Sequence, residues 1–441
     1  MKNKPKTRRY SFAKIFLFLL LFLCVCASAF TFYQIADKIL DLMFPSAENL
    51  TMSLSSSSSA KEKLSSSEEI NHTAVYTPVK GLFAPYSEAA QLRLEKMTTK
   101  EKVGQVFLFT CPEAGAVKMI DDYQPGGYCL TARDFADKTA EQVRKTLASY
   151  QNSSKIKMIL CCDEEGGTVV RISKYSELSP QKFRSPQEIY RLSGLDGIEQ
   201  DTVKKAQLMK SLGLNMNLAP VCDVSVDPSD YIHARAFGQN AKQTAEFVRI
   251  SVKAYLQEGV ACTLKHFPGY GNNEDTHSGI VRDKRSYQTF QLYDFLPFQA
   301  GIQAGAPCVM VCHNIVECMD SQNPASLSPQ VHRILRETIG FSGVIMTDDL
   351  SMKAITDFTN DQNAAVQAFL AGNDILLTSD IKNSFRALYA AVEDGTISME
   401  RLDESVLRIL AWKYSIWEFC HKKLKRSRSA ICAPTPLYFY F

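Results

Sequence analysis

Residues 263–277 read TLKHFPGYGNNEDTH. This stretch starts as a short apolar run, reaches Lys265 and His266, and then enters a loop rich in Gly and Asn that carries Asp275 and His277. An apolar run that ends in charged residues is typical of a strand buried on both faces, with its carboxyl end open to a site. The pattern recurs along the chain, and its repetition predicts the fold.

Seven other short apolar runs share this character, namely 106–110, 126–131, 158–164, 216–220, 308–313, 343–348 and 375–379. Helical patterns separate most of them, and Gly or Asn often closes these helices. Eight strands alternating with helices indicate an α/β protein with a (β/α)8 TIM barrel, regular or irregular. An open doubly wound sheet is the second candidate, but it usually carries an early Gly-rich phosphate turn, and the sequence has no GxGxxG.

The barrel domain is predicted at residues 88–418, with three flanking segments. Basic residues precede an uncharged stretch from 15 to 36, which predicts a signal peptide or a membrane anchor at 1–36. Ala27-Ser28-Ala29 offers a cleavage site, yet the stretch is long enough to span a bilayer, so both readings stay open. Residues 37–87 are expected to be a Ser-rich flexible linker, and residues 419–441 a basic, poorly ordered tail.

These segments and the composition limit the cellular setting. The N-terminal segment predicts export, either to the extracellular face of the membrane as an anchored protein or as a secreted one. The net charge is only +3, which gives no reason to expect a nucleic-acid partner. The 13 cysteines form no CxxC pair with zinc spacing, so we expect mostly buried thiols and no metal site.

In a TIM barrel the functional residues lie at the carboxyl ends of the strands. Asp163 ends the third apolar run, Lys265 and His266 the fifth, His313 the sixth, and Asp348 the seventh. Any one of these charged residues can be explained by a structural ion pair. Because several occur at the ends of different strands, they are expected to converge on one mouth and form a functional site.

These residue types fit glycoside hydrolysis with retention, which needs a nucleophilic carboxylate and an acid/base. Asp348 suits the nucleophile, because a buried strand fixes its backbone. His277 suits the acid/base, because a histidine gives and takes protons near neutral pH, and Asp275 is close enough to orient its ring. Asp349 is expected to face elsewhere and to bond the following turn.

Other strand-end residues suit the recognition of a sugar. Lys265 and His266 are adjacent on a rigid strand end and are expected to donate to hydroxyls. Asp163 is expected to accept from two hydroxyls, and Arg235, in the segment ARAFG, to present a fork of donors. For Lys265, an ion pair with a neighbouring strand-end acid is the alternative.

With these residues in view, the chain resembles glycoside hydrolase family 3, specifically its single-domain β-N-acetylhexosaminidase branch, over about residues 90 to 418. The resemblance rests on KMTTKEKVGQVF (96–107), PGGYCL (125–130), CDEEGGTVVRI (162–172), NLAPVCDV (217–224), ARAFG (234–238), KHFPGYGNNEDTH (265–277) and GVIMTDDLSM (343–352). The last two segments are the most specific for this branch.

The resemblance implies a retaining double displacement, without metal or organic cofactor, that releases terminal N-acetylglucosamine from cell-wall or chitin-type oligosaccharides. It matches Asp348 to the nucleophile, His277 to the acid/base and Asp275 to its partner. It matches the sugar-holding residues to Asp163, Arg235, Lys265 and His266. The chain departs from the pattern at Tyr270, where His or Leu is common, and in a loop one residue shorter before Asp275.

Other functions remain open at this point. One is a β-glucosidase or an N-acetylglucosaminide phosphorylase of the same family, since a histidine acid/base adds no anion that would repel phosphate. Another is a non-catalytic sugar-binding barrel. The presence of Asp348, Asp275 and His277 together argues against a non-catalytic role.

Overall fold

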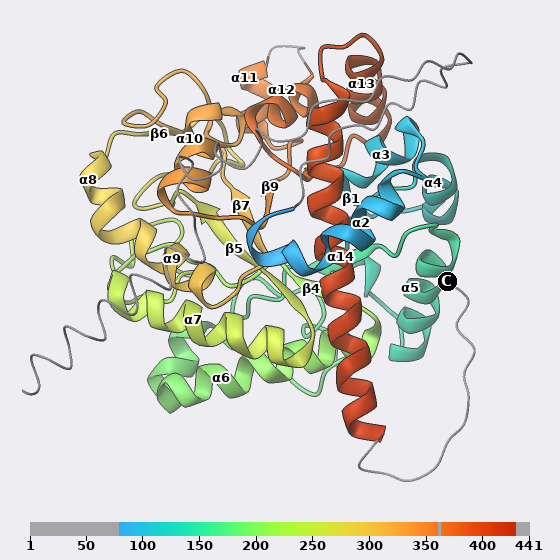
Figure 1. Cartoon of the computed structure of the whole chain (residues 1–441). Coiled ribbons are helices and arrows are strands. Elements are labelled where there is room, and N and C mark those ends of the chain that lie inside the picture. The colour runs from blue at the N-terminus through green and yellow to red at the C-terminus, as the bar shows by residue number, and fades with distance from the viewer. Residues whose placement is uncertain (1–78, 360–362, 429–441) are drawn as a thin grey trace, which may run out of the picture. The chain divides into compact units, whose positions relative to one another are not determined.

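Eight parallel strands form a barrel in the computed structural model, which describes residues 79–359 and 363–428 (Figure 1). All eight predicted strands are confirmed. They are β1 (Phe107–Thr110), β2 (Gly127–Cys129), β3 (Ile159–Cys162), β4 (Met216–Asn217), β5 (Ala261–Phe267), β7 (Cys308–Val311), β9 (Val344–Thr347) and β10 (Leu376–Thr378).

The strands pair in chain order, with β10 beside β1, and the barrel closes between β9 and β10. A parallel bridge joins Met346 to Ile375, which precedes β10. The Thr347 N–H also donates to the Ile375 carbonyl at 3.1 Å. This closure brings the carboxyl ends of all eight strands to one rim.

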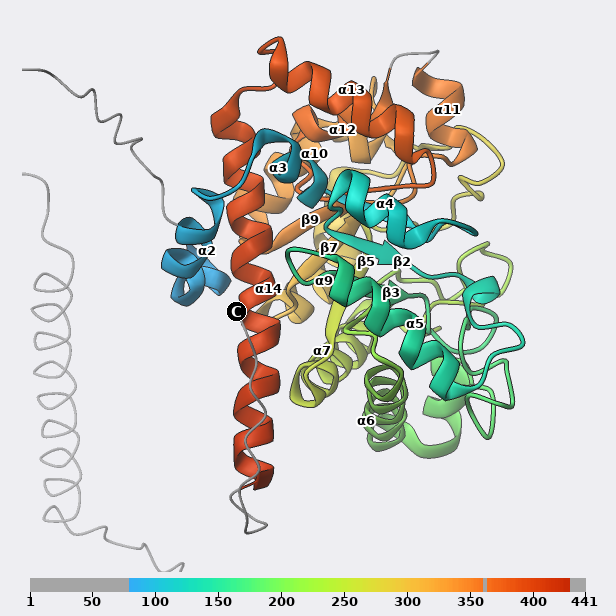
Figure 2. The same ribbon diagram turned by 90° about the vertical axis from the view of Figure 1, so that its right-hand side faces the viewer.

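Helices surround the barrel, as Figures 1 and 2 show. The longer ones are α2 (Ser87–Leu94), α3 (Thr99–Gln105), α4 (Ala116–Tyr123), α5 (Ala140–Ser153), α6 (Pro186–Leu212), α7 (Ala241–Glu258), α9 (Phe295–Gln303), α12 (Ala364–Ala371), α13 (Ile381–Glu393) and α14 (Met399–Arg428). Shorter helical segments are η2 (Gly81–Tyr86), η3 (Ala132–Asp134), α8 (Tyr287–Thr289), η4 (Phe290–Asp294), η5 (Ala325–Leu327), α10 (Pro329–Arg333), η6 (Ile334–Thr338) and α11 (Lys353–Thr359).

Local sequence sets where these helices begin and end. Thr139 caps α5 by accepting from the Gln142 N–H, while the Gln142 side chain bonds back to Thr139. Asn240 caps α7 in the same way, by accepting from the Gln243 N–H. Gly259 ends α7 with a φ of +76°, a left-handed conformation that glycine adopts without a steric penalty.

The strands are buried along nearly their whole length, since one face of each points into the barrel and the other lies under helices. This burial explains their continuous apolar sequence. It also accounts for the thiols: the nine cysteines from Cys111 to Cys318 are all free, and all but Cys318 are buried. The expectation of mostly buried thiols is therefore confirmed for this part of the chain.

A buried carboxylate fastens α14 to the barrel. Asp374, just before β10, accepts from Arg336 Nη2 and Ser405 Oγ, both at 2.7 Å, and forms an ion pair with Arg408. Ser405 and Arg408 belong to α14. The helix runs on to Arg428, past residue 418, where the barrel domain was predicted to end.

The predicted signal or anchor at 1–36, and most of the predicted linker, lie outside the described residues. Within the described residues, no helix combines the length and apolar character needed to cross a membrane.

A small two-stranded sheet arranges the loops above the barrel mouth. β6 (Arg282–Asp283) follows the loop after β5, and β8 (Ile315–Val316) follows β7; the two pair in parallel. This pairing joins the C-terminal end of the 269–281 loop to the segment that follows β7. The loop that carries Asp275 and His277 is therefore attached to the barrel at both of its ends.

Candidate active site

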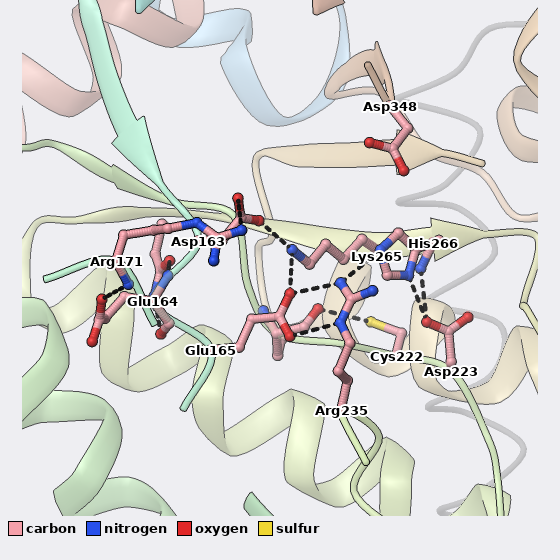
Figure 3. Close-up of polar contacts among 12 residues, drawn as sticks. Asp163, Glu164, Glu165, Arg171, Cys222, Asp223, Arg235, Lys265, His266 and Asp348 are labelled. Carbon is pink, nitrogen blue, oxygen red and sulfur yellow. Dashed lines mark hydrogen bonds and ion pairs between the residues drawn. The ribbon is translucent and has the colours of Figure 1, made fainter. Parts of the chain in front are cut away.

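The predicted sugar-binding residues meet at the carboxyl ends of β3 and β5. Figure 3 shows Asp163, Lys265 and His266 in one row, with Arg235 below them and the Asp348 carboxylate pointing toward them from above. Arg235 comes from the connection between β4 and α7. Four segments that are distant in the sequence therefore contribute to one site.

A buried glutamate organises two of these residues. Lys265 Nζ lies 2.7 Å from Asp163 Oδ1 and 2.6 Å from Glu165 Oε1. Arg235 donates to the same glutamate through Nε at 3.1 Å and Nη2 at 2.8 Å. Lys265 therefore forms the ion pair with neighbouring strand-end acids that was the alternative prediction, while its binding of a sugar hydroxyl stays a prediction.

The charges of this cluster stabilise one another. Burial alone would raise the pKa of Glu165, but the Lys265 ammonium and the Arg235 guanidinium hold it far below its ordinary value. Burial would lower the pKa of Lys265, yet Asp163 and Glu165 raise it overall. Glu165, Lys265 and Arg235 therefore stay charged at neutral pH and form a cluster of fixed charges.

His266 is oriented by a second buried carboxylate. Its Nδ1 lies 2.7 Å from Asp223 Oδ2, and its Nε2 lies 3.2 Å from Arg235 Nη2. Because a guanidinium only donates, Nε2 accepts and the ring proton sits on Nδ1. In this arrangement Nε2 of His266 faces the Arg235 guanidinium, and the binding of a sugar hydroxyl by His266 stays a prediction.

Asp348 stands directly after β9, where its N–H donates to the Val311 carbonyl at 3.1 Å. Its Oδ1 accepts from the Asp349 N–H at 2.8 Å. Burial alone would raise the pKa of Asp348, but nearby His313, His266 and Lys265, together with this hydrogen bond, lower it overall. The carboxylate is therefore ionised at neutral pH, as a nucleophile requires.

His313 and Asp349 support the segment that carries Asp348. His313 Nε2 lies 3.0 Å from the Asp349 carbonyl, and Nδ1 lies 2.8 Å from Ser326 Oγ. Since a carbonyl only accepts, Nε2 carries the proton. Asp349 Oδ1 accepts from the Ser351 N–H at 2.9 Å, as expected of a residue that bonds the next turn.

Asp275 and His277 form the predicted pair on the loop after β5. Asp275 Oδ1 accepts from His277 Nδ1 at 2.7 Å and from the His277 N–H at 2.9 Å, so the other ring nitrogen is free of this pair. Burial would raise the pKa of Asp275, but its bonds from His277 and from the Tyr231 side chain lower it overall. The Thr276 carbonyl, between the two residues, accepts from the Ala354 N–H at 3.3 Å, so the loop of this pair contacts α11, which follows Asp348 in the chain.

The roles of some residues of the site were not predicted from the sequence. Glu165 and Asp223 lie inside the segments 162–172 and 217–224, so their positions were marked but not their roles. No sequence pattern marked Tyr231, whose side chain forms a hydrogen bond with Asp275. In the described part of the chain, no three His, Cys, Asp or Glu side chains are grouped as a metal site would need.

An ionised carboxylate at a strand end, a carboxylate–histidine pair on a loop after β5 and a buried cluster of fixed charges are the kinds of group found at the mouths of barrel enzymes. Residues 98–412 match the glycosyl hydrolase family 3 N terminal domain. This match covers more than half of the chain, which therefore belongs to glycoside hydrolase family 3.

Two curated relatives are similar over most of the barrel. Beta-hexosaminidase A of Pseudoalteromonas piscicida is 31% identical over 325 residues, covering 67% of this chain and 54% of that protein. Beta-hexosaminidase of Stenotrophomonas maltophilia (strain R551-3) is 35% identical over 274 residues, covering 60% of this chain and 79% of that protein.

A solved structure has the same fold. The glycoside hydrolase family 3 beta-N-acetylglucosaminidase from Paenibacillus sp. str. FPU-7 superposes with a TM-score of 0.68 at 29% identity. The match covers 78% of this chain and 65% of that one. The predicted family and barrel are both confirmed.

Proposed function

We propose that this family 3 glycoside hydrolase is a retaining, exo-acting β-N-acetylhexosaminidase. Its substrates would be cell-wall or chitin-type oligosaccharides that end in N-acetylglucosamine. The observation that carries the proposal is the Asp275–His277 pair, at 2.7 Å, on a loop that contacts α11, the helix after the ionised Asp348. The relatives named hexosaminidase and N-acetylglucosaminidase support this choice of sugar.

In the first step, an Asp348 oxygen bonds to the anomeric carbon while the glycosidic carbon–oxygen bond breaks. His277 gives its proton to the departing oxygen, so that an alcohol leaves rather than an alkoxide. Asp275 accepts from Nδ1 and stabilises the charged ring before transfer. In the second step, water attacks the same carbon, His277 takes a proton from it, and the bond to Asp348 breaks.

The buried charges around Lys265 hold the sugar in place for these steps. Lys265 can donate to a hydroxyl while it stays paired with Asp163 and Glu165. Asp163 and Arg235 lie beside it and can bind neighbouring hydroxyls or the acetamide. Rigid partners of this kind place the anomeric carbon near Asp348 without flexible side chains having to be ordered first.

Replacing the nucleophile tests this proposal. Asp348→Gly should reduce turnover of an aryl N-acetyl-β-glucosaminide by about a thousandfold or more, because no covalent intermediate can form. Added azide should restore part of that turnover and yield the α-glycosyl azide. Asp137→Gly is the matched control, since Asp137 is exposed and has a φ of +55°, which glycine tolerates well. Unchanged turnover in Asp348→Gly would contradict the proposal.

We also propose that the enzyme acts outside the cytoplasm, anchored or secreted, on the strength of the basic and apolar residues 1–36. Mass spectrometry of the mature N-terminus is expected to find either an intact start in the membrane fraction or cleavage after Ala29. An intact N-terminus on protein recovered from the cytoplasm would contradict export.

A further inference from the structure

The residue between Asp275 and His277 differs sharply from its neighbours in burial. The His277 side chain is 61% exposed and that of Asp275 is 32% exposed. Thr276, between them, is 1% exposed. The proposed acid/base, His277, and its partner, Asp275, therefore stand on either side of a single buried residue.

Thr276 is anchored by the phenol of Tyr270, six residues earlier in the same loop. Tyr270 Oη lies 2.8 Å from Thr276 Oγ1 and accepts from the Thr276 N–H at 2.9 Å. The Thr276 carbonyl accepts in turn from the Ala354 N–H at 3.3 Å, on α11. The Tyr270 phenol therefore links two parts of the same loop, and α11 contacts this loop at Thr276.

Tyr270 is also fixed at its backbone end. Its N–H donates to Asp223 Oδ1 at 2.7 Å, and Asp223 Oδ2 is the acceptor for His266 Nδ1. Its ring packs edge-on against the His266 ring, with centroids 5.8 Å apart. A continuous series of contacts therefore runs from the sugar-holding strand end, through Asp223 and Tyr270, to Thr276.

We propose that Tyr270 is a positioning residue that sets the Asp275–His277 pair at a fixed place relative to the sugar held by the end of β5. The proposal rests on the proposed acid/base function of His277. Without the phenol, the buried Thr276 N–H and hydroxyl lose their partner, and the exposed residues on either side lose their shared anchor. Proton transfer requires such a fixed geometry, whereas binding of the sugar by Lys265 and Arg235 does not depend on it.

Substrates with different leaving groups distinguish positioning from a merely structural role. A 2,4-dinitrophenyl glycoside needs little help from an acid, whereas an unactivated disaccharide needs full protonation of the departing oxygen. Tyr270→Phe keeps the ring and removes only the hydroxyl. We expect kcat/KM on N,N′-diacetylchitobiose to fall about tenfold or more, and on the dinitrophenyl N-acetylglucosaminide to fall less than about threefold.

Two further variants complete the experiment. Tyr128→Phe removes another buried phenol, whose Oη donates to the Ala116 carbonyl at 2.8 Å, and should lower stability without any dependence on the leaving group. His277→Gln should show a strong dependence on the leaving group. Thermal melting of each variant checks that it is folded.

The outcomes separate the two claims. If His277→Gln shows the leaving-group dependence and Tyr270→Phe loses both substrates equally, or loses neither, the positioning role of Tyr270 is wrong. If His277→Gln itself shows no such dependence, the acid/base function is wrong, and the role of Tyr270 falls with it.

Discussion

Lys265 shows how single residues of this site depend on partners from other strands. It is buried at the end of β5, and its charge persists because Asp163 and Glu165, both beyond β3, lie 2.7 and 2.6 Å from its Nζ. Sequence reasoning found Lys265 and Asp163 by their places at strand ends. It missed Glu165 as their organiser, because the path of the chain after β3 decides which of the three successive acids at 163–165 face the lysine.

Removing the charge of Glu165 should therefore affect both stability and substrate binding. Glu165→Gln leaves Lys265 and Arg235 buried with one carboxylate fewer, and breaking a buried pair in this way costs about 3 kcal/mol or more of unfolding free energy. We also expect KM to rise about tenfold or more, since both cations lose their fixed positions. Chemical denaturation and steady-state kinetics measure the two effects.

The matched control is Glu113→Gln. Glu113 pairs with Arg133 at 3.2 Å on the surface, where such a pair contributes at most about 1 kcal/mol. An equal change in stability and KM for the two variants would show that the Glu165 cluster has no special importance.

At the scale of elements, the strands were predictable and the connections were not. Each barrel strand lies within a compact apolar run of the sequence, because the barrel strands are buried along nearly their whole length. The two-stranded sheet of β6 and β8 left no such run, because β6 consists of the charged residues Arg282 and Asp283 and β8 has only two residues. A break inside α6 at Gly194, where φ is +60°, was likewise not predicted.

Helix α14 carries a buried lysine that predicts an effect of pH on stability. Lys413 Nζ donates to Gln105 Oε1 at 2.7 Å, but a neutral amide does not replace lost hydration, and burial lowers the pKa of Lys413 to about 7. In the unfolded chain a lysine titrates near 10.4, so between about pH 7 and 10 the unfolded chain binds more protons. Stability should therefore rise with pH across this window.

Lys413→Met removes the buried amine and tests whether this amine causes the pH dependence of stability. We expect the variant to melt several degrees above the wild type at pH 7, and this difference to shrink as the pH approaches 10. Lys382→Met, at an exposed position of α13, should change the melting temperature little at either pH. A difference that stays constant from pH 7 to pH 10 would show that Lys413 is not held neutral by burial.

For the whole molecule, closure of the barrel turns separate sequence signals into one site. The order of the strands and the bridge between Met346 and Ile375 bring Asp163, Lys265 and Asp348 to the same rim. The residue types and the barrel rule predicted that Asp163, Lys265 and Asp348 gather there, but they did not predict the roles of Glu165 and Asp223. The orienting contacts, such as Asp223 with His266 and Tyr231 with Asp275, required the folded chain, because they join loops whose paths no local pattern specifies.

We propose that the enzyme hydrolyses a terminal N-acetylglucosaminide with retention of configuration. Proton NMR of the reaction in phosphate buffer can follow the anomer that is released first. With an aryl N-acetyl-β-glucosaminide as substrate, we expect free β-N-acetylglucosamine to appear first and the α anomer to grow only by mutarotation. The aryl β-glucoside should react more slowly. Early appearance of the α anomer or of N-acetylglucosamine 1-phosphate would contradict hydrolysis with retention. Faster cleavage of the glucoside would contradict the choice of sugar.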